Sequence, residues 1–283
     1  MIILNIDITN ITGSLSKMGA NINNKKGYNL DDKEEFKIVN DTLSRFGIDT
    51  SLFINNLKTL IIKSETASHL IDNDSIVSHG SYNPLTNEIM LVDESALIHE
   101  LFHMASNKLD YTNNLGVLFH KNGREVCKSL NEGITDLFTS MSINGYECKY
   151  PLESLFASFL SEIYGNEIFV YHFKQNPSQV YKLFKEDIQK VAMIIVKLDE
   201  YTNSFDVNIG LIPQKFIDFC TLYLKFMYEK DENMAISHFE RIKNTFTLEN
   251  ENAKKISQII SQKININEVF DKIKDDVFGK AMK

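Results

Sequence analysis

The chain has 283 residues, enough for one large domain or for two lobes that share a cleft. A hydrophobic content of 43% and a charged content of 24% are typical of globular proteins, and a net charge of −8 argues against nucleic acid or an anionic membrane as the main partner. No apolar run reaches the roughly 18 residues that a transmembrane helix needs. The start lacks the basic residues of a secretory signal, and the three cysteines are widely spaced, which predicts free thiols and a cytoplasmic location.

The first elements of the chain predict a helix and a strand. Residues 1–30 are rich in Asn and contain at most one short strand. An amphipathic helix that stops at Gly47 follows, with apolar residues at steps of three or four: Phe36, Val39, Leu43 and Phe46. Residues 57–63 fit either a strand or a helix end, and the β-branched residues favour the strand.

A hairpin is predicted next, leading directly into a helix. Residues 81–87 are rich in turn formers, and residues 88–92 are a short apolar run that predicts a strand. An edge strand can pair with an extended peptide, although the sequence leaves open which strand lies at the edge. Residues 94–109 contain no Gly or Pro, and Asp93 is suited to be the N-cap of a helix there.

This helix carries the sequence H-E-x-x-H, formed by His99, Glu100 and His103. Residues four apart on a helix are neighbours, so both imidazoles can bind one metal ion while the stripe of Leu and Met faces the core. Zinc binds imidazole nitrogen, and Glu100 would then face a water molecule on the metal. The motif therefore predicts one zinc ion per chain.

The third ligand is expected from the later segment Asn131-Glu132-Gly133-Ile134-Thr135-Asp136. Together the two motifs resemble the gluzincins, the thermolysin-like zinc metallopeptidases, in which a second helix supplies a Glu ligand. The resemblance implies that Glu132 is the third ligand and that Asp136 hydrogen-bonds a zinc-bound His. From the residues alone, Asp110 is an alternative ligand if the first helix ends early, and Asn131 is suited to be the N-cap of the second helix.

Strand signals largely vanish after residue 112, and the remaining segments predict helices separated by loops such as residues 203–210. The expected helices are residues 150–164 ending at Gly165, 180–198, 212–228, 235–246 and 254–261. The expected fold class is α+β. A small N-terminal lobe, residues 1–112, would carry a short sheet and the zinc helix, and a mainly helical C-terminal lobe, residues 113–283, would carry the third ligand, with a cleft between them.

These features predict a zinc-dependent metallopeptidase that acts on peptide or protein substrates, with Glu100 as general base. The family places a Tyr or His from the second lobe at the developing oxyanion. Tyr150 is the first choice for that role, and the others are His172, Tyr146 and His238. The alternative is a catalytically inactive, zinc-containing protein that binds peptides or regulates a partner. The sequence gives no indication of the oligomeric state.

Overall fold

A computed structural model describes residues 27–64, 80–110, 114–121, 124–247, 251–261 and 265–279. The described chain is mostly helical and contains one three-stranded sheet and one two-stranded hairpin, which is compatible with the expected α+β class. The strand considered for residues 1–30 lies almost entirely outside the described residues. All three cysteines are free thiols, as predicted. Among the described helices none is long and apolar enough to cross a membrane.

The first helices follow the predicted pattern of apolar residues. Helix α1 (Glu34–Arg45) buries its apolar side against the core and is followed by Gly47, whose φ of +68° favours glycine. Residues 57–63 contain both a helix end and the start of a strand, the two structures considered for this segment. Helix α2 (Ser51–Leu57) ends at its first residue, and strand β1 (Ile61–Ser64) begins within it.

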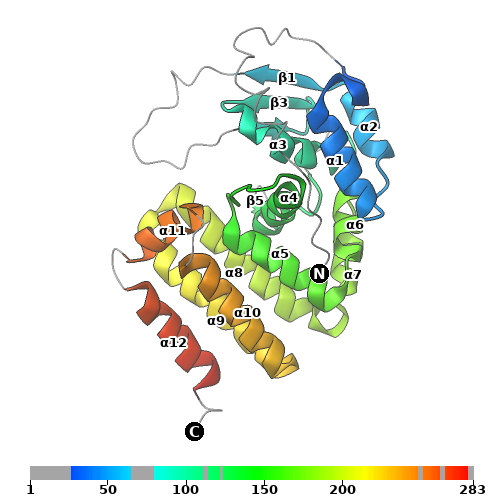
Figure 1. Ribbon diagram of the computed structural model, residues 1–283. Helices are drawn as coiled ribbons and strands as arrows, with labels where there is room; N and C mark the ends of the chain where they lie inside the picture. Colours follow the sequence, from blue (N-terminus) through cyan, green and yellow to red (C-terminus); the bar gives the residue numbers. More distant parts are fainter. Residues whose placement is uncertain are drawn as a thin grey trace.

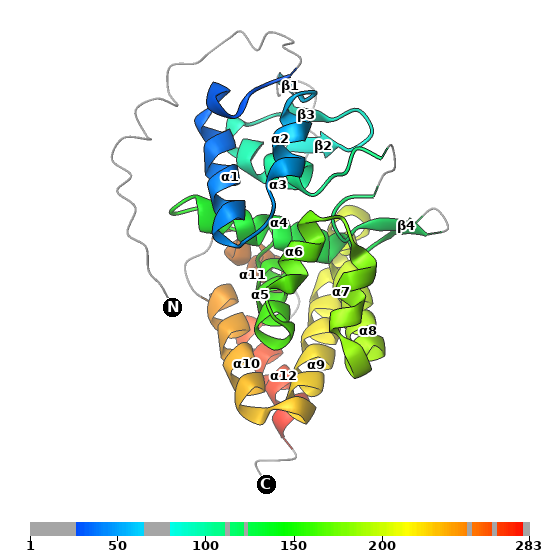
Figure 2. The ribbon, with the colours of Figure 1, turned by 90° about the vertical axis from the view of Figure 1, so that its right-hand side faces the viewer.

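The three-stranded sheet has the order β1-β3-β2. Strands β2 (Gly80–Asn83) and β3 (Glu88–Leu91) form the predicted antiparallel hairpin, and β1 runs parallel to β3. Strand β3 is therefore central, and its Ile89 and Leu91 are buried. Within the described part of the chain, β2 is an edge strand, and helix α3 packs against it (Figures 1 and 2).

Helix α3 (Leu97–Ala105) is entered through a 3₁₀ turn, η3 (Glu94–Ala96). The Asp93 side chain caps this turn by accepting a hydrogen bond from the amide of Ser95, as predicted. The helix was expected to continue to residue 109 and instead ends at Ala105. Side chains donate hydrogen bonds to two carbonyls of its last turn. The Ser106 hydroxyl donates to the His103 carbonyl, and the Asn56 side-chain amide donates to the Met104 carbonyl.

Two features of the next segment differ from the prediction. Strands β4 (Phe119–Lys121) and β5 (Arg124–Val126) form a hairpin that was not predicted, because three residues are too few for a visible alternation. Helix α4 (Lys128–Ser142) begins earlier than an Asn131 N-cap would allow. Its N-cap is Cys127, with a left-handed φ of +64°, so Glu132 lies inside the helix instead of at its start.

Helices and 3₁₀ turns make up the rest: α5 (Pro151–Tyr164), α6 (Glu167–Phe173), α7 (Pro177–Leu183), η4 (Lys185–Asp187), α8 (Ile188–Val207), η5 (Ile209–Leu211), α9 (Ile212–Lys230), α10 (Glu232–Thr247), α11 (Glu251–Ser261) and α12 (Ile266–Phe278). The single helix expected for residues 180–198 is wrong, because Lys185 has a φ of +47° that interrupts it. The expected loop 203–210 is helical as far as Val207. Helix α4 lies between the sheet and the C-terminal helices in both views (Figures 1 and 2).

Candidate metal centre

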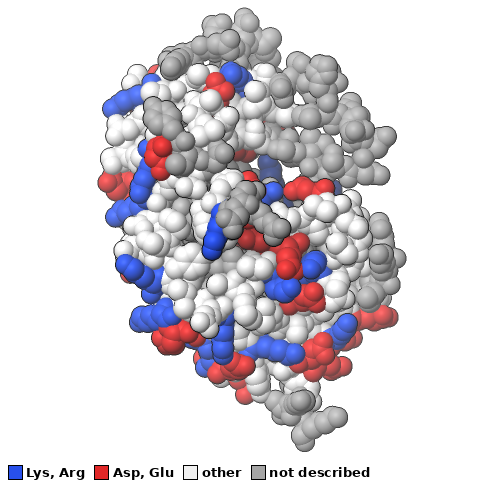
Figure 3. Space-filling view, turned by 180° about the vertical axis from the view of Figure 1, so that it is seen from behind, with Lys and Arg blue, Asp and Glu red and all other residues white. Residues whose placement is uncertain are grey.

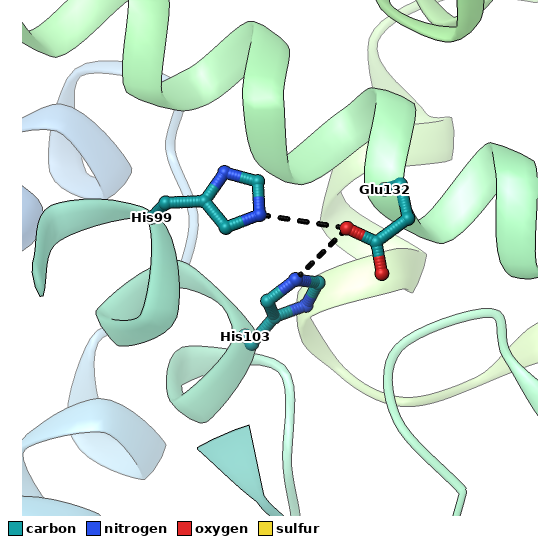
Figure 4. Close-up of side chains that lie close together, drawn as sticks. All are labelled: His99, His103 and Glu132. Carbon is teal, nitrogen blue, oxygen red and sulfur yellow. Dashed lines mark ion pairs between the residues drawn. The ribbon is translucent and has the colours of Figure 1, made fainter. Parts of the chain in front are cut away.

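Helix α3 directs two histidine rings toward helix α4. His99 and His103 are one turn apart, and their ring centroids are 4.9 Å from each other with the rings nearly perpendicular. Both rings are almost fully buried. Because the apolar side chains of α3 occupy the core side of the helix, the two histidines are left on the side that faces α4 (Figure 4).

Glu132 of α4 meets both rings with a single oxygen. Its Oε2 lies 3.4 Å from Nε2 of His99 and 3.3 Å from Nε2 of His103 (Figure 4). The donor atoms of these three residues all lie within 4.8 Å of one another, and they form a group that could hold a metal ion. The alternative ligand Asp110 does not belong to this group.

The chemistry of the three donors fits zinc. Two imidazole nitrogens and one carboxylate oxygen are the ligands of several catalytic zinc sites, which keep one further position for water. The Nε2 atoms of both rings point to the same carboxylate oxygen, so the two rings present equivalent nitrogens to a shared point. The Nδ1 atoms remain available to fix the rings from behind, as metal-binding histidines require.

The Nδ1 atom of His103 is held by the residues that flank Glu132. The Thr135 hydroxyl and the Asn131 amide nitrogen each lie 3.3 Å from it. When Nε2 binds a metal, Nδ1 carries the proton and donates it, and the Thr135 hydroxyl is then the acceptor. The Oδ1 atom of Asn131 has no hydrogen-bond partner among the described residues. A 180° flip of the Asn131 side-chain amide would bring Oδ1 to Nδ1 of His103 as a second acceptor.

Asp136 lies behind His99. Its Oδ1 is 3.7 Å from Nδ1 of His99, beyond hydrogen-bonding distance, so this nitrogen is buried without a hydrogen-bond partner in the described part of the chain. Four donors hold the carboxylate in place: the Tyr146 hydroxyl at 2.7 Å, the Tyr150 amide at 2.9 Å, the Ser154 hydroxyl at 3.0 Å and the Lys149 amide at 3.3 Å. A small rotation of the His99 ring would complete the predicted bond.

The charges in the site depend on one another. Burial alone would raise the pKa of Glu132, but His103 and His99 outweigh it and hold this pKa well below the usual range. For His103, burial favours the neutral form, but the carboxylate of Glu132 reverses this and raises the pKa. A carboxylate that remains ionised at this position is what a cation would require.

Glu100 and Tyr150 lie beside the three donors. Burial raises the pKa of Glu100, which therefore holds a proton more readily than an exposed Glu. A Cβ placed on Gly80 of the edge strand would come within 3.2 Å of a Glu100 carboxylate oxygen, so this carboxylate lies against strand β2. The ring of Tyr150 is stacked on His99, with centroids 6.1 Å apart.

These residues open onto a cavity of about 2480 Å³. His99, Glu100, His103, Glu132 and Tyr150 all line it. Within the described ranges, eleven Asp and Glu residues line the cavity against three Lys and Arg residues. Figure 3 shows acidic side chains beside a hollow on the face of the molecule seen from behind.

The other candidates for the oxyanion have different surroundings. His172 is fully buried in the core, and burial lowers its pKa to about 3. His238 is also buried, where it contacts the Tyr223 hydroxyl and the Glu162 carboxylate. Neither is among the residues that line the cavity. Tyr146 lines the cavity, but its hydroxyl donates to Asp136.

Three features of the site were not foreseen from the sequence. The contacts of Thr135 and Asn131 with His103 follow from helical spacing, since positions four apart on α4 share a face. The positions of Asn131 and Thr135 on either side of Glu132 in the sequence could therefore have predicted these contacts. The position of Glu153 in the cavity wall had no such signal, because it depends on how α5 packs against α4.

No protein-family model, no curated protein and no solved structure matches the chain. The likeness to gluzincins therefore rests on the two motifs.

Proposed function

We propose that this chain is a zinc-dependent metallopeptidase in which His99, His103 and Glu132 hold one zinc ion and Glu100 is the general base. The observation that supports it most directly is the convergence of the two Nε2 atoms on one Glu132 oxygen, inside a large cavity that Glu100 also lines. Structural zinc sites are usually closed by four protein ligands, often cysteines. Here the described residues offer three ligands and no cysteine.

Each residue has a defined task in this proposal. Bound zinc supplies a Lewis acid that lowers the pKa of water and polarises a peptide carbonyl. The Glu100 carboxylate accepts the proton of the attacking water and delivers it to the nitrogen of the leaving amine, a role for which its raised pKa is suited. Thr135 keeps the ring of His103 in position through Nδ1, and Asp136 would do the same for His99 after the small rotation of that ring.

Tyr150 is the proposed donor to the oxyanion. The charge of Glu132 and burial raise the pKa of Tyr150 well above its ordinary value, so its hydroxyl keeps its proton at neutral pH. Its amide is anchored on Asp136, and its ring is stacked on His99, which places it at the edge of the metal centre. A donor fixed before the reaction commonly contributes about 3–4 kcal/mol to such a step.

The cavity suits a peptide or protein substrate. We assign residues 1–112 to an N-terminal lobe, residues 113–283 to a C-terminal lobe, and the cavity to the cleft between them, because residues of both ranges line it. Ser81, Tyr82 and Asn83 of the edge strand β2 are among these residues, so an extended peptide could pair with that strand beside Glu100. No role in binding nucleic acid or membranes is proposed, and the cytoplasmic location stays a prediction.

The test compares the wild type with Glu100→Gln. Purified wild-type protein should contain one zinc per chain by elemental analysis and should cleave an unstructured protein substrate. A chelator should stop the cleavage, and added zinc should restore it. Glu100→Gln should keep the zinc and lose activity by about 100-fold to 10,000-fold, the usual contribution of a general base.

Two results would contradict this function. If wild type and Glu100→Gln cleave the substrate equally slowly, the carboxylate has no catalytic role. If carefully purified protein contains no stoichiometric transition metal and does not take up zinc, the metal centre itself is wrong. Zinc binding without any cleavage would favour the inactive peptide-binding alternative.

A further inference from the structure

One wall of the cavity has a buried carboxylate that the proposed mechanism does not use. Glu153 lies on α5 one turn beyond Tyr150, and only 2% of its surface is exposed. A Cβ placed on Gly133 would lie 2.3 Å from the Glu153 carbonyl oxygen, so the two helices are in direct contact one residue after Glu132. Glu153 is therefore next to the metal centre and lines the same cavity.

Among the described residues, this carboxylate has a neutral partner and no cationic one. The Thr202 hydroxyl of α8 lies 2.7 Å from its Oε1 and also lies within hydrogen-bonding distance of the Leu198 carbonyl. Within the described residues, no Lys, Arg or His forms an ion pair with Glu153. Buried carboxylates in proteins are usually paired with a charge or a metal. Burial raises the pKa of Glu153 to about 7, so the group is partly neutral at neutral pH, and an external cation that reached this wall would favour its ionised form.

Aromatic side chains line the same cavity as Glu153. Tyr150, Tyr201 and Phe205 line the cavity with it, and the rings of Tyr201 and Phe205 meet edge to face with centroids 5.2 Å apart. The Tyr201 hydroxyl is buried and has no hydrogen-bond partner among the described residues. A carboxylate beside aromatic faces is a combination that attracts ammonium and guanidinium groups.

The net charge of the cavity lining also favours a cationic ligand. Its lining has an excess of acidic over basic residues in the described ranges, and one of the basic residues, Lys128, is neutralised by Asp206 at 3.3 Å. A concave surface of one sign concentrates ligands of the opposite sign. The field of the cavity and the carboxylate in its wall therefore select the same kind of ligand.

We propose that Glu153, supported by Thr202 and sharing the cavity lining with Tyr150, Tyr201 and Phe205, forms a subsite for a cationic group of the substrate. The group is an ammonium or a guanidinium, from the side chain of a Lys or Arg residue or from the free N-terminus of the peptide. This inference rests on the proposed function, because it assumes that the ligand is a peptide substrate.

The test measures a ratio of rates. Peptides of one sequence carry Lys, norleucine or Glu at successive positions around the cleaved bond, each with a free or an acetylated N-terminus. Wild type should prefer the best cationic peptide over its neutral counterpart by about tenfold or more in kcat/KM, which corresponds to about 1.4 kcal/mol. A loss on acetylation identifies the N-terminus, and a loss on exchange of Lys for norleucine identifies the side chain.

Three variants assign the preference to Glu153. Glu153→Gln keeps the size of the side chain and an acceptor for Thr202, and it should reduce the preference to within about twofold. Glu153→Asp keeps the charge and should retain a preference for the cation. Glu94→Gln removes one charge from an exposed residue in the cavity lining and should leave the ratio unchanged.

Binding separates this inference from the proposed function. The same peptides can be titrated onto Glu100→Gln protein and onto the Glu100→Gln/Glu153→Gln double variant. A cation preference in the first that is absent in the second supports the subsite even if no peptide is ever cleaved. The subsite is refuted if cationic and neutral peptides bind and react alike, or if Glu153→Gln and Glu94→Gln change the ratio equally while both proteins remain folded.

Discussion

Asp199→Ala should destabilise the protein and weaken its metal centre together, although Asp199 lies on α8. Its carboxylate caps the N-terminus of α4 from outside that helix. One oxygen accepts the Cys127 amide at 2.9 Å, and the other accepts the Ser129 amide at 2.9 Å and the Ser129 hydroxyl at 2.6 Å. The first turn of α4 leads directly to Glu132, so the loss of this cap would loosen this proposed ligand.

The size of the effect follows from these three bonds. Loss of an N-cap side chain costs about 0.5–2 kcal/mol, and a hydrogen bond to a charged group contributes about 1.5–3 kcal/mol. Because the donors are buried and two belong to one residue, we expect a total loss of about 3 kcal/mol. Unfolding entropy of about 2.1 cal/mol/K per residue over 283 residues gives about 0.6 kcal/mol/K, so Tm should fall by about 5 °C.

Thermal unfolding and zinc affinity are the two measurements. The affinity, obtained by competition with a chromogenic chelator, should fall by about tenfold, the low end for groups that support a ligand. The matched control is Glu200→Ala, one residue along α8, where a partly exposed carboxylate contacts Lys197 and Lys215 and should contribute about 1 kcal/mol or less. If Asp199→Ala unfolds at the wild-type temperature, or loses stability with unchanged zinc affinity, the cap does not position Glu132.

Two further substitutions test the packing around α4. Gly133→Ala should cost about 1–3 kcal/mol in urea unfolding, because the new methyl group would overlap the Glu153 carbonyl; a more stable protein would contradict this packing, since Ala is otherwise the better helix former. Asp136→Ala should lower zinc affinity by about 10-fold to 100-fold, because the His99 ring loses the carboxylate behind it, and an unchanged affinity in the same chelator competition would contradict the role of Asp136.

The candidate metal site was largely foreseeable because the rules that group its residues are local. The spacing of His99 and His103 places both rings on one face of any helix, and the same rule places Glu132 and Asp136 on one face of the next. The apolar stripe decides which side of α3 packs on the hydrophobic core, and this leaves the histidines facing α4. The sequence alone could not bring the two helices together, and this required the motif resemblance.

The elements that were missed depend on residues far away in the chain. Asn131 is a good N-cap by type, but Asp199 of α8 supplies the cap, so α4 begins at Lys128. The end of α3 is set by Asn56, whose amide reaches two carbonyls of that segment. The helix expected for residues 180–198 is interrupted at Lys185 by a left-handed backbone conformation, which the residue types in that segment do not predict. Such contacts have no periodicity that a sequence pattern could reveal.

Helix α4, which carries the proposed ligand Glu132, is held from both sides by parts of the chain that follow it. Asp199 fixes its first turn, and Asp136, one turn beyond Glu132, is fixed by Tyr146, Tyr150 and Ser154. A ligand that binds only the folded state adds its binding free energy to stability, and the coupling is reciprocal. Substitutions that loosen α4 should therefore lower zinc affinity and stability in the same direction, whereas substitutions in α12, which packs mainly on α9, should lower stability alone.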